Sequence, residues 1–97
     1  MINSHTFNVL FWLKKTSVRR DETLPIYARI YLDSTRVDLS TKQVILEEDW
    51  CEKSKRAFKR RKNASLINEE LDAMSSNLKK AYLELKDGYA FLFIAFF

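Results

Sequence analysis

Apolar and polar residues alternate along the first forty residues, and this period of two predicts β-strands that each bury one face. The first predicted strand spans residues 6–13, and its apolar side consists of Phe7, Val9, Phe11 and Leu13. Its opposite side consists of Asn8, Leu10 and Trp12, and continues to Lys14. The polar and charged residues 14–23 that follow predict a long hairpin loop.

Two further strands are predicted, one that begins at about Pro25 and runs to residue 32, and one over residues 35–40, with a two-residue turn at Asp33-Ser34. Such a turn places Arg29 opposite Asp38, so that apolar residues meet on one face and polar or aromatic residues on the other. A shift by one residue would mix the two faces, so the pattern predicts the register as well. Residues 43–46 extend this sheet or form a short edge piece, and residues 47–50 predict a tight helical turn that tucks Trp50 under the sheet.

Apolar residues then recur at spacings of three and four, which is the period of an α-helix with one apolar stripe. The stripe consists of Ile67, Leu71, Met74, Leu78, Tyr82 and Leu85. It predicts a helix over about residues 65–87, capped by Ser65 or Asn63 and stopped at Gly88. Because the sheet and the helix each have one apolar face to bury, we expect an α+β fold: a three-stranded antiparallel sheet packed on one long C-terminal α-helix.

This packing leaves the second face of the sheet uncovered, and that face carries Trp12, Lys14, Tyr27, Arg29, Tyr31 and Arg36. A β-sheet can enter the major groove of a DNA duplex, where Arg contacts base edges and aromatic rings pack on sugars or thymine methyl groups. The alternative is that this face, which includes Leu10, docks on another domain or protein.

The net charge of +4 is concentrated rather than spread. Residues 47–52 carry only acidic charges, whereas residues 53–62 hold seven basic side chains and no acidic one. Such a basic run is typical of proteins that bind a polyanion, although a solvated loop leading into the helix explains it as well. A second basic group, Lys14, Lys15, Arg19 and Arg20, lies in the predicted hairpin loop.

The sequence predicts no catalytic site, metal site or cofactor. Its single histidine, His5, lies at the N-terminal end, and the single cysteine, Cys51, excludes an internal disulfide and a cysteine metal cluster. The single glycine, Gly88, excludes a Gly-rich phosphate loop. One free cysteine fits a reducing cytoplasm, and the apolar residues 89–97 are far fewer than the roughly 20 that span a membrane.

Four segments resemble the N-terminal arm-binding domain of Bacteroidetes tyrosine recombinases, the integrases of phages and conjugative transposons. They are T-F-N-V-L-F-W-L-K-K, L-P-I-Y-A-R-I, R-V-D-L-S-T-K and E-E-D-W, the last followed by a basic stretch and a Leu-rich helix. The resemblance implies a domain over residues 4–87 whose uncovered sheet face binds arm-type DNA sites, with no catalytic domain in this chain. The family usually has Gly where this chain has Glu22 and Ser34, and residues 88–97 resemble an aberrant apolar tail on a truncated protein.

We therefore expect a cytoplasmic, non-enzymatic module of a site-specific integrase that binds double-stranded DNA, with other recombinase protomers or domains as further candidate partners and no membrane partner. The predicted DNA-binding residues are Lys14, Lys15, Arg19, Arg20, Tyr27, Arg29, Tyr31, Arg36, Lys42, Lys53, Lys55, Arg56, Lys59, Arg60, Arg61 and Lys62. The main alternative is a protein-interaction module that uses the Trp12, Tyr27 and Tyr31 face, and a more remote one is an RNA-associated basic protein.

Overall fold

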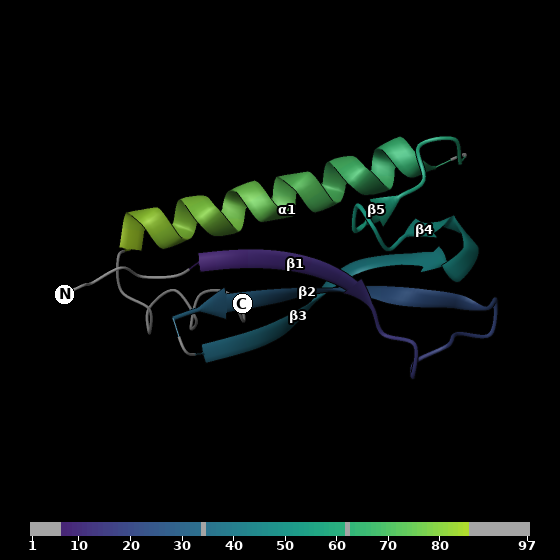
Figure 1. The fold of residues 1–97 in the computed structure, drawn as a ribbon, viewed down its shortest axis with the longest axis horizontal. Helices are drawn as coiled ribbons and strands as arrows, with labels where there is room; N and C mark the ends of the chain where they lie inside the picture. The colour runs from purple at the N-terminus through teal and green to yellow at the C-terminus, as the bar shows by residue number, and fades with distance from the viewer. Residues whose placement is uncertain (1–6, 34, 62, 86–97) are drawn as a thin grey trace.

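The computed structural model describes residues 7–33, 35–61 and 63–85 of the chain. These residues form a three-stranded antiparallel sheet in the order β1-β2-β3, a separate two-stranded ribbon, and a long helix that runs along one face of the sheet (Figure 1). The elements are β1 Phe7–Leu13, β2 Thr23–Leu32, β3 Thr35–Leu46, the 3-10 helix η1 Glu47–Asp49, β4 Trp50–Cys51, β5 Arg56–Ala57 and α1 Ala64–Leu85. The predicted α+β fold is confirmed.

The register between β2 and β3 is the one that the alternation predicts. Arg29 lies opposite Asp38, and Ile30 lies opposite Val37. Asp33, the first residue of the connecting turn, adopts a φ of 55°, a left-handed conformation that Asp tolerates better than most residues. The apolar members of both strands therefore share one face of the sheet.

Both β2 and β3 are longer than predicted. β2 begins at Thr23 rather than at Pro25, and β3 continues to Leu46, which confirms that residues 43–46 extend the sheet. The carbonyl of Pro25 accepts a hydrogen bond from the amide of Lys14 at 3.1 Å. In an antiparallel pair the amide and carbonyl of one residue point to the same side, so the missing N–H of Pro25 faces the end of β1, where the ladder stops.

A bulge interrupts the ladder between β2 and β3. Tyr27 pairs with Ser40, but the preceding residue of β2, Ile26, pairs with Gln43, so Thr41 and Lys42 have no partner on β2. The Thr41 hydroxyl replaces the lost ladder bond by donating to the carbonyl of Ile26 at 2.7 Å. Because two residues are inserted rather than one, the side chains on either side of the bulge keep their faces.

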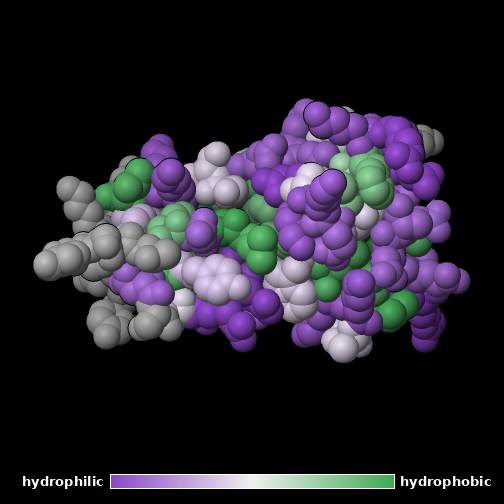
Figure 2. All heavy atoms as spheres, viewed as in Figure 1, coloured by the Kyte–Doolittle hydropathy of each residue, from purple (hydrophilic) through white to green (hydrophobic). Residues whose placement is uncertain are grey.

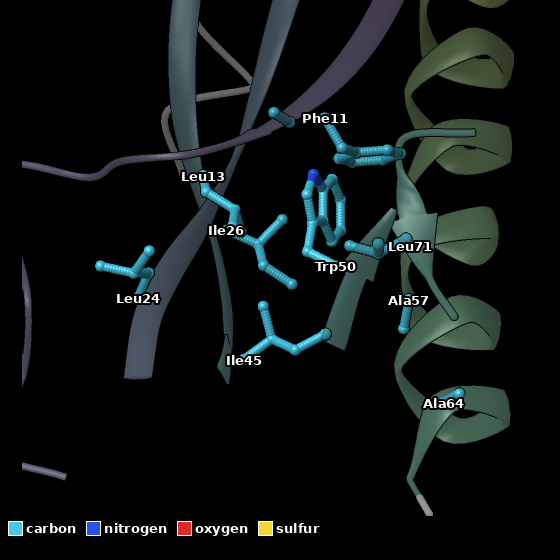
Figure 3. Close-up of a cluster of buried hydrophobic side chains, with 10 residues drawn as sticks. Phe11, Leu13, Leu24, Ile26, Ile45, Trp50, Ala57, Ala64 and Leu71 are labelled. Atoms are coloured by element: carbon cyan, nitrogen blue, oxygen red, sulfur yellow. The ribbon is translucent and has the colours of Figure 1, made fainter. Parts of the chain in front are cut away.

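The main core lies between the sheet, the β4-β5 ribbon and α1, with Trp50 at its centre (Figure 3). Trp50 is only 4% exposed and packs among Phe11, Ile26 and Leu71. Since Trp50 directly follows η1, the predicted tight turn with Trp50 under the sheet is confirmed. A second cluster at the other end of the sheet contains Ile30, Leu32 and Tyr82.

The helix α1 buries the apolar stripe that its sequence predicts. Leu71 is fully buried, and the half-buried members of the stripe are Ile67, Met74, Leu78 and Tyr82. These residues contact both core clusters, so the helix is held along its length by the sheet.

The start of α1 decides between the two predicted caps. The amide of Ile67 donates to the carbonyl of Asn63 at 3.1 Å, and the helix begins at Ala64. Asn63 therefore occupies the N-cap position, and the alternative cap at Ser65 is wrong because Ser65 already lies inside the first turn.

Some predictions fall on residues outside the described ranges. They concern the stop at Gly88, the domain limits at residues 4 and 87, the tail over residues 88–97, and Lys62 and Ser34. Within the described ranges, no helix is both long enough and apolar enough to cross a lipid bilayer.

Candidate nucleic-acid interface

Where all three strands pair, the face of the sheet opposite α1 consists of three cross-strand rows. We call these rows, together with the adjoining Lys14, the open face. Because β1 and β3 both pair with β2, each row takes one residue from each strand. The rows are Asn8, Tyr31 and Arg36; Leu10, Arg29 and Asp38; and Trp12, Tyr27 and Ser40. Their immediate neighbours Phe11, Ala28 and Ile30 are buried on the helix side, so the predicted assignment of the two faces is confirmed.

A continuous stack of charged and aromatic groups crosses the centre of the open face. The Arg29 guanidinium lies over the Trp12 ring at 4.5 Å from its centroid, and the Trp12 and Tyr27 rings are 5.6 Å apart. The Lys14 ammonium lies 5.1 Å from the centroid of the Tyr27 ring. Cations over aromatic faces are held by the ring quadrupole, so these side chains are ordered on a surface that no other element of the described residues covers.

Asp38 holds the other edge of Arg29. Arg29 Nε donates to one carboxylate oxygen of Asp38 at 2.9 Å, and Nη2 lies 3.4 Å from the other oxygen. This hydrogen bond is the main cause that raises the pKa of Arg29 above its ordinary value, with the partial burial of the group opposing it and Tyr31 adding a smaller favourable interaction. The centre of the open face is therefore locally neutral and well ordered.

The rim of the open face carries unpaired cations. Arg36 is the second residue of β3, Lys42 lies in the bulge, and Arg19 and Arg20 lie in the loop between β1 and β2. None of these four has an ion pair among the residues that the structure describes. Lys15, in the same loop, pairs with Glu47 at 3.1 Å.

The loop between β1 and β2 is an ordered turn at its tip. The amide of Glu22 donates to the carbonyl of Arg19 at 2.9 Å, and the amide of Arg19 donates to the carbonyl of Thr23 at 2.9 Å. Asp21 accepts hydrogen bonds from the amide and hydroxyl of Thr23 at 3.0 and 2.6 Å. These bonds, the one from the hydroxyl first, lower the pKa of Asp21 below its ordinary value and keep the tip in one conformation.

The basic run over residues 53–62 lies elsewhere, on the helix side of the sheet. Arg56 packs over the Phe11 ring at 4.8 Å from its centroid and pairs with Asp72 of α1 at 2.9 Å. The backbone of Ala57 exchanges two hydrogen bonds, of 2.8 and 3.1 Å, with the side-chain amide of Asn68 on α1. Figure 2 shows hydrophilic side chains crowded over this end of the molecule, where β4, β5 and the start of α1 lie.

Acidic neighbours pair with three of the cations in this run. Besides Arg56, Lys55 pairs with Glu52 at 2.8 Å, and Arg61 pairs with Asp49 at 2.8 Å. In the part of the run that the structure describes, the cations without an ion pair are Lys53, Lys59 and Arg60. The run is thus folded on the helix rather than being a solvated loop, and its free charge is much lower than its sequence suggests.

The turn that joins β4 to β5 explains the fold of this segment. The amide of Lys55 donates to the carbonyl of Cys51 at 2.8 Å, and Lys55 takes a left-handed φ of 59°. A turn of four residues between two-residue strands has no hydrophobic period, so the alternation along the chain did not predict it.

The same turn affects the free cysteine. Hydrogen bonding with Ser54 lowers the pKa of the Cys51 thiol below its ordinary value.

Sequence reasoning missed two residues of the open face and two residues of the helix as members of these sites. Asp38 and Trp12 were not among the predicted DNA-binding residues, although the predicted register already placed Asp38 opposite Arg29. The partners on α1, Asn68 and Asp72, lie 11 and 16 residues from the groups that they bind, and no local pattern indicates such contacts.

Comparison with known families decides the identity of this fold. A family model described as an Arm DNA-binding domain matches residues 11–88. The chain belongs to the arm DNA-binding domain family. No curated protein and no solved structure matches it significantly. The match runs from β1 through α1 and thus includes most of the open face and the whole β4-β5 ribbon.

Membership of this family confirms the predicted resemblance to the arm DNA-binding domain of integrases and gives DNA as the partner of the domain. An arm DNA-binding domain is a DNA-binding module of integrase-type recombinases, and it is not itself a catalytic module. DNA is therefore the partner that one or more of the surfaces described above must bind.

Proposed function

We propose that this arm DNA-binding domain is part of a tyrosine recombinase, and that its own role is not catalysis but the binding of duplex arm-type sites with its open face. The observation that carries the proposal is the order of the open face: cations stacked on aromatic rings over a sheet surface that no other described element covers. A duplex-DNA partner also implies that the domain works in the cytoplasm.

The dimensions of the sheet support insertion into a major groove. Three strands about 4.8 Å apart span roughly 10 Å, and the major groove of B-DNA is about 12 Å wide. In that position the three rows would face base edges, and the rim cations would face the phosphates on both sides. Arg36 and Lys42 on β3, and Arg20 in the loop, suit this second role because they form no ion pair with acids of the described chain. Arg19 forms none either, although its charge interacts with the nearby Asp21.

The helix-side cations have a lesser part in this proposal. Lys53, Lys59 and Arg60 can reach flanking phosphates if the duplex bends toward that end, which would add a salt-dependent term without sequence preference. Lys55, Arg56 and Arg61 would first have to release their acidic partners, so their contribution is smaller.

The test is a fluorescence titration of a labelled DNA duplex at two salt concentrations. The variant carries Lys14→Glu and Arg36→Glu on the open face, and the matched control carries Lys79→Glu and Lys80→Glu on the exposed side of α1, with the same change in net charge. We expect the open-face variant to lose more than about tenfold in affinity and about two or more in the salt slope, because each lost phosphate contact lowers that slope by about one. An equal loss in both variants would show that binding follows net charge and not this face.

A docking role for the same face remains the alternative, because Leu10 and Trp12 are apolar and lie on it. Light scattering separates the two roles. If the face docks on protein, the domain should self-associate or bind a purified recombinase core, and the Lys14→Glu and Arg36→Glu variant should still do so.

A further inference from the structure

We propose that Arg29 reads a guanine base and that Asp38 is the positioning residue that fixes Arg29 for this task. The inference rests on the proposed function, since it assumes that the open face meets a duplex. It assigns to one cluster on that face a base preference that the family match does not give.

Arg29 lies at the centre of the sheet and is restrained on two sides. Its neighbours across the strands are Leu10 on β1 and Asp38 on β3. The Trp12 ring covers one flat side of the guanidinium at 4.5 Å, and the Asp38 carboxylate binds the edge formed by Nε and Nη2. A long side chain that normally rotates freely is thereby held in a single orientation, which removes much of the entropy cost of a later contact.

The donors that remain on Arg29 match one base. A guanidinium has five N–H donors, and Asp38 takes one on Nε and one on Nη2. The two donors on Nη1 and the second donor on Nη2 have no carboxylate partner among the described residues, and the Arg29 side chain is 24% exposed. The Tyr31 hydroxyl interacts with this group and uses at most one of the three donors, so two remain for a base. In the major groove guanine presents two adjacent acceptors, N7 and O6, whereas adenine presents one acceptor beside a donor. A fixed fork of two donors therefore favours guanine.

The negative charge of Asp38 is unexpected on a surface that would lie against DNA phosphates. A carboxylate there repels DNA and cancels the charge of Arg29, so the pair adds little to non-specific attraction. A cross-strand ion pair would stabilise the sheet by only about 0.2–1 kcal/mol. The position of Asp38 is explained if its carboxylate orients Arg29, because a supporting hydrogen bond holds a functional side chain in its productive geometry.

The first experiment selects binding sequences from a pool of random duplexes with the full chain. Wild type should enrich a sequence with a fixed guanine, and replacing that guanine by 7-deazaguanine, which lacks only the N7 acceptor, should weaken wild-type binding about fivefold or more. Arg29→Ala and Arg29→Lys should bind the two duplexes equally, because Lys keeps the charge but lacks the fork. Thermal melting by circular dichroism verifies that both variants are folded.

The second experiment separates positioning from simple ion pairing. Asp38→Asn should raise affinity for a random duplex, because a negative charge is lost, and should lower the discrimination between guanine and 7-deazaguanine at least threefold. The matched control is Asp72→Asn, which breaks the equivalent pair with Arg56 on the helix side. It should raise non-specific affinity slightly and leave the discrimination unchanged.

The outcomes distinguish the two proposals. If wild type selects a sequence but Arg29→Ala keeps the 7-deazaguanine effect, the guanine assignment is overturned while the open-face proposal stands. If Asp38→Asn keeps full discrimination, Asp38 has no positioning role. If the open-face variant Lys14→Glu and Arg36→Glu binds duplex DNA as well as wild type, the proposed function fails and the guanine assignment fails with it.

Discussion

Two regions of this arm DNA-binding domain are rich in arginine and lysine, and they are built in opposite ways. On the open face the cations at the rim form no ion pair in the described chain, and at the centre Lys14 and Arg29 lie on aromatic rings, with Arg29 alone paired to an acid, Asp38. In the ribbon region, residues 50–61, three cations pair with acids, and Arg56 seals the core at Phe11. The run at residues 53–61 has the higher density of cations in the sequence, but fewer of them are free to bind DNA, because acidic side chains nearby in space neutralise three of them.

The two tryptophans give the largest expected contrast between these regions. Trp50→Ala removes a fully packed ring from the core and should lower the free energy of unfolding by about 3–5 kcal/mol. Trp12→Ala removes a half-buried ring from the open face and should cost only about 1–2 kcal/mol while weakening DNA binding. Neither indole Nε1 has a hydrogen-bond partner among the described residues, so truncation orphans no acceptor and the difference measures packing.

Urea denaturation of both variants measures these losses. Similar destabilisation by the two substitutions would contradict the picture of one packed ring and one surface platform.

A pair of arginines should show the contrast in binding. Arg36→Ala should weaken duplex binding about tenfold and lower the salt slope by about one, with the free energy of unfolding changed by less than about 0.5 kcal/mol. Arg56→Ala should do the reverse: it loses a half-exposed pair with Asp72 and its packing over Phe11, which together stabilise by about 1 kcal/mol, and it leaves affinity nearly unchanged.

Each arginine variant is titrated with a DNA duplex and melted in parallel. The contrast breaks down if Arg56→Ala loses more affinity than Arg36→Ala.

A smaller contrast concerns two turn residues at positive φ. Glu22 has a φ of 68° in the loop between β1 and β2, and Lys55 has a φ of 59° in the turn of the ribbon. Glu22→Gly should raise stability by about 1 kcal/mol, because Gly adopts this conformation without strain and Glu22 has no ion pair among the described residues. Lys55→Gly should gain less, since it also loses the half-exposed pair with Glu52, which contributes about 0.5 kcal/mol.

Thermal melting compares the two glycine variants. A loss of stability in Glu22→Gly would contradict this prediction, because it would show that the Glu22 side chain stabilises the fold by more than its left-handed backbone costs.

The smallest expected effect is on the pH dependence of stability. Hydrogen bonds from Thr23 lower the folded pKa of Asp21 below its ordinary value of 3.8. Its contribution is therefore fully present above about pH 3.8 and is lost as the pH falls through the lower folded pKa. Asp21→Ala should be less stable than wild type at pH 6, and the difference, measured by urea denaturation over a series of pH values, should shrink as the pH falls below 3.8.

Much of the fold follows from the sequence because period and register are local properties. The alternation of β1 to β3 predicted which side of the sheet each residue occupies, and the stripe of α1 predicted its buried face. The same register predicted that Tyr27, Arg29, Tyr31 and Arg36 share one surface.

The ribbon could not be predicted in the same way. Its two-residue strands depend on Asn68, which binds the backbone of Ala57 from 11 residues away, and the pairing of Arg56 depends on Asp72. Both contacts exist only once the helix has packed. For this reason the predicted site included cations of the run at residues 53–61 that the fold partly neutralises.

The two-residue bulge in β3 has a consequence for how this domain can vary in length. Thr41 and Lys42 form an even insertion, so removing both would shorten the strand yet leave Ile45 pointing into the core. Removing Lys42 alone would turn the distal part of β3 over, presenting Ile45 to solvent and forcing the half-exposed Val44 inward. Natural and engineered relatives should therefore differ here by zero or two residues, and a library of single deletions across residues 40–43 should contain far fewer folded members than one of double deletions.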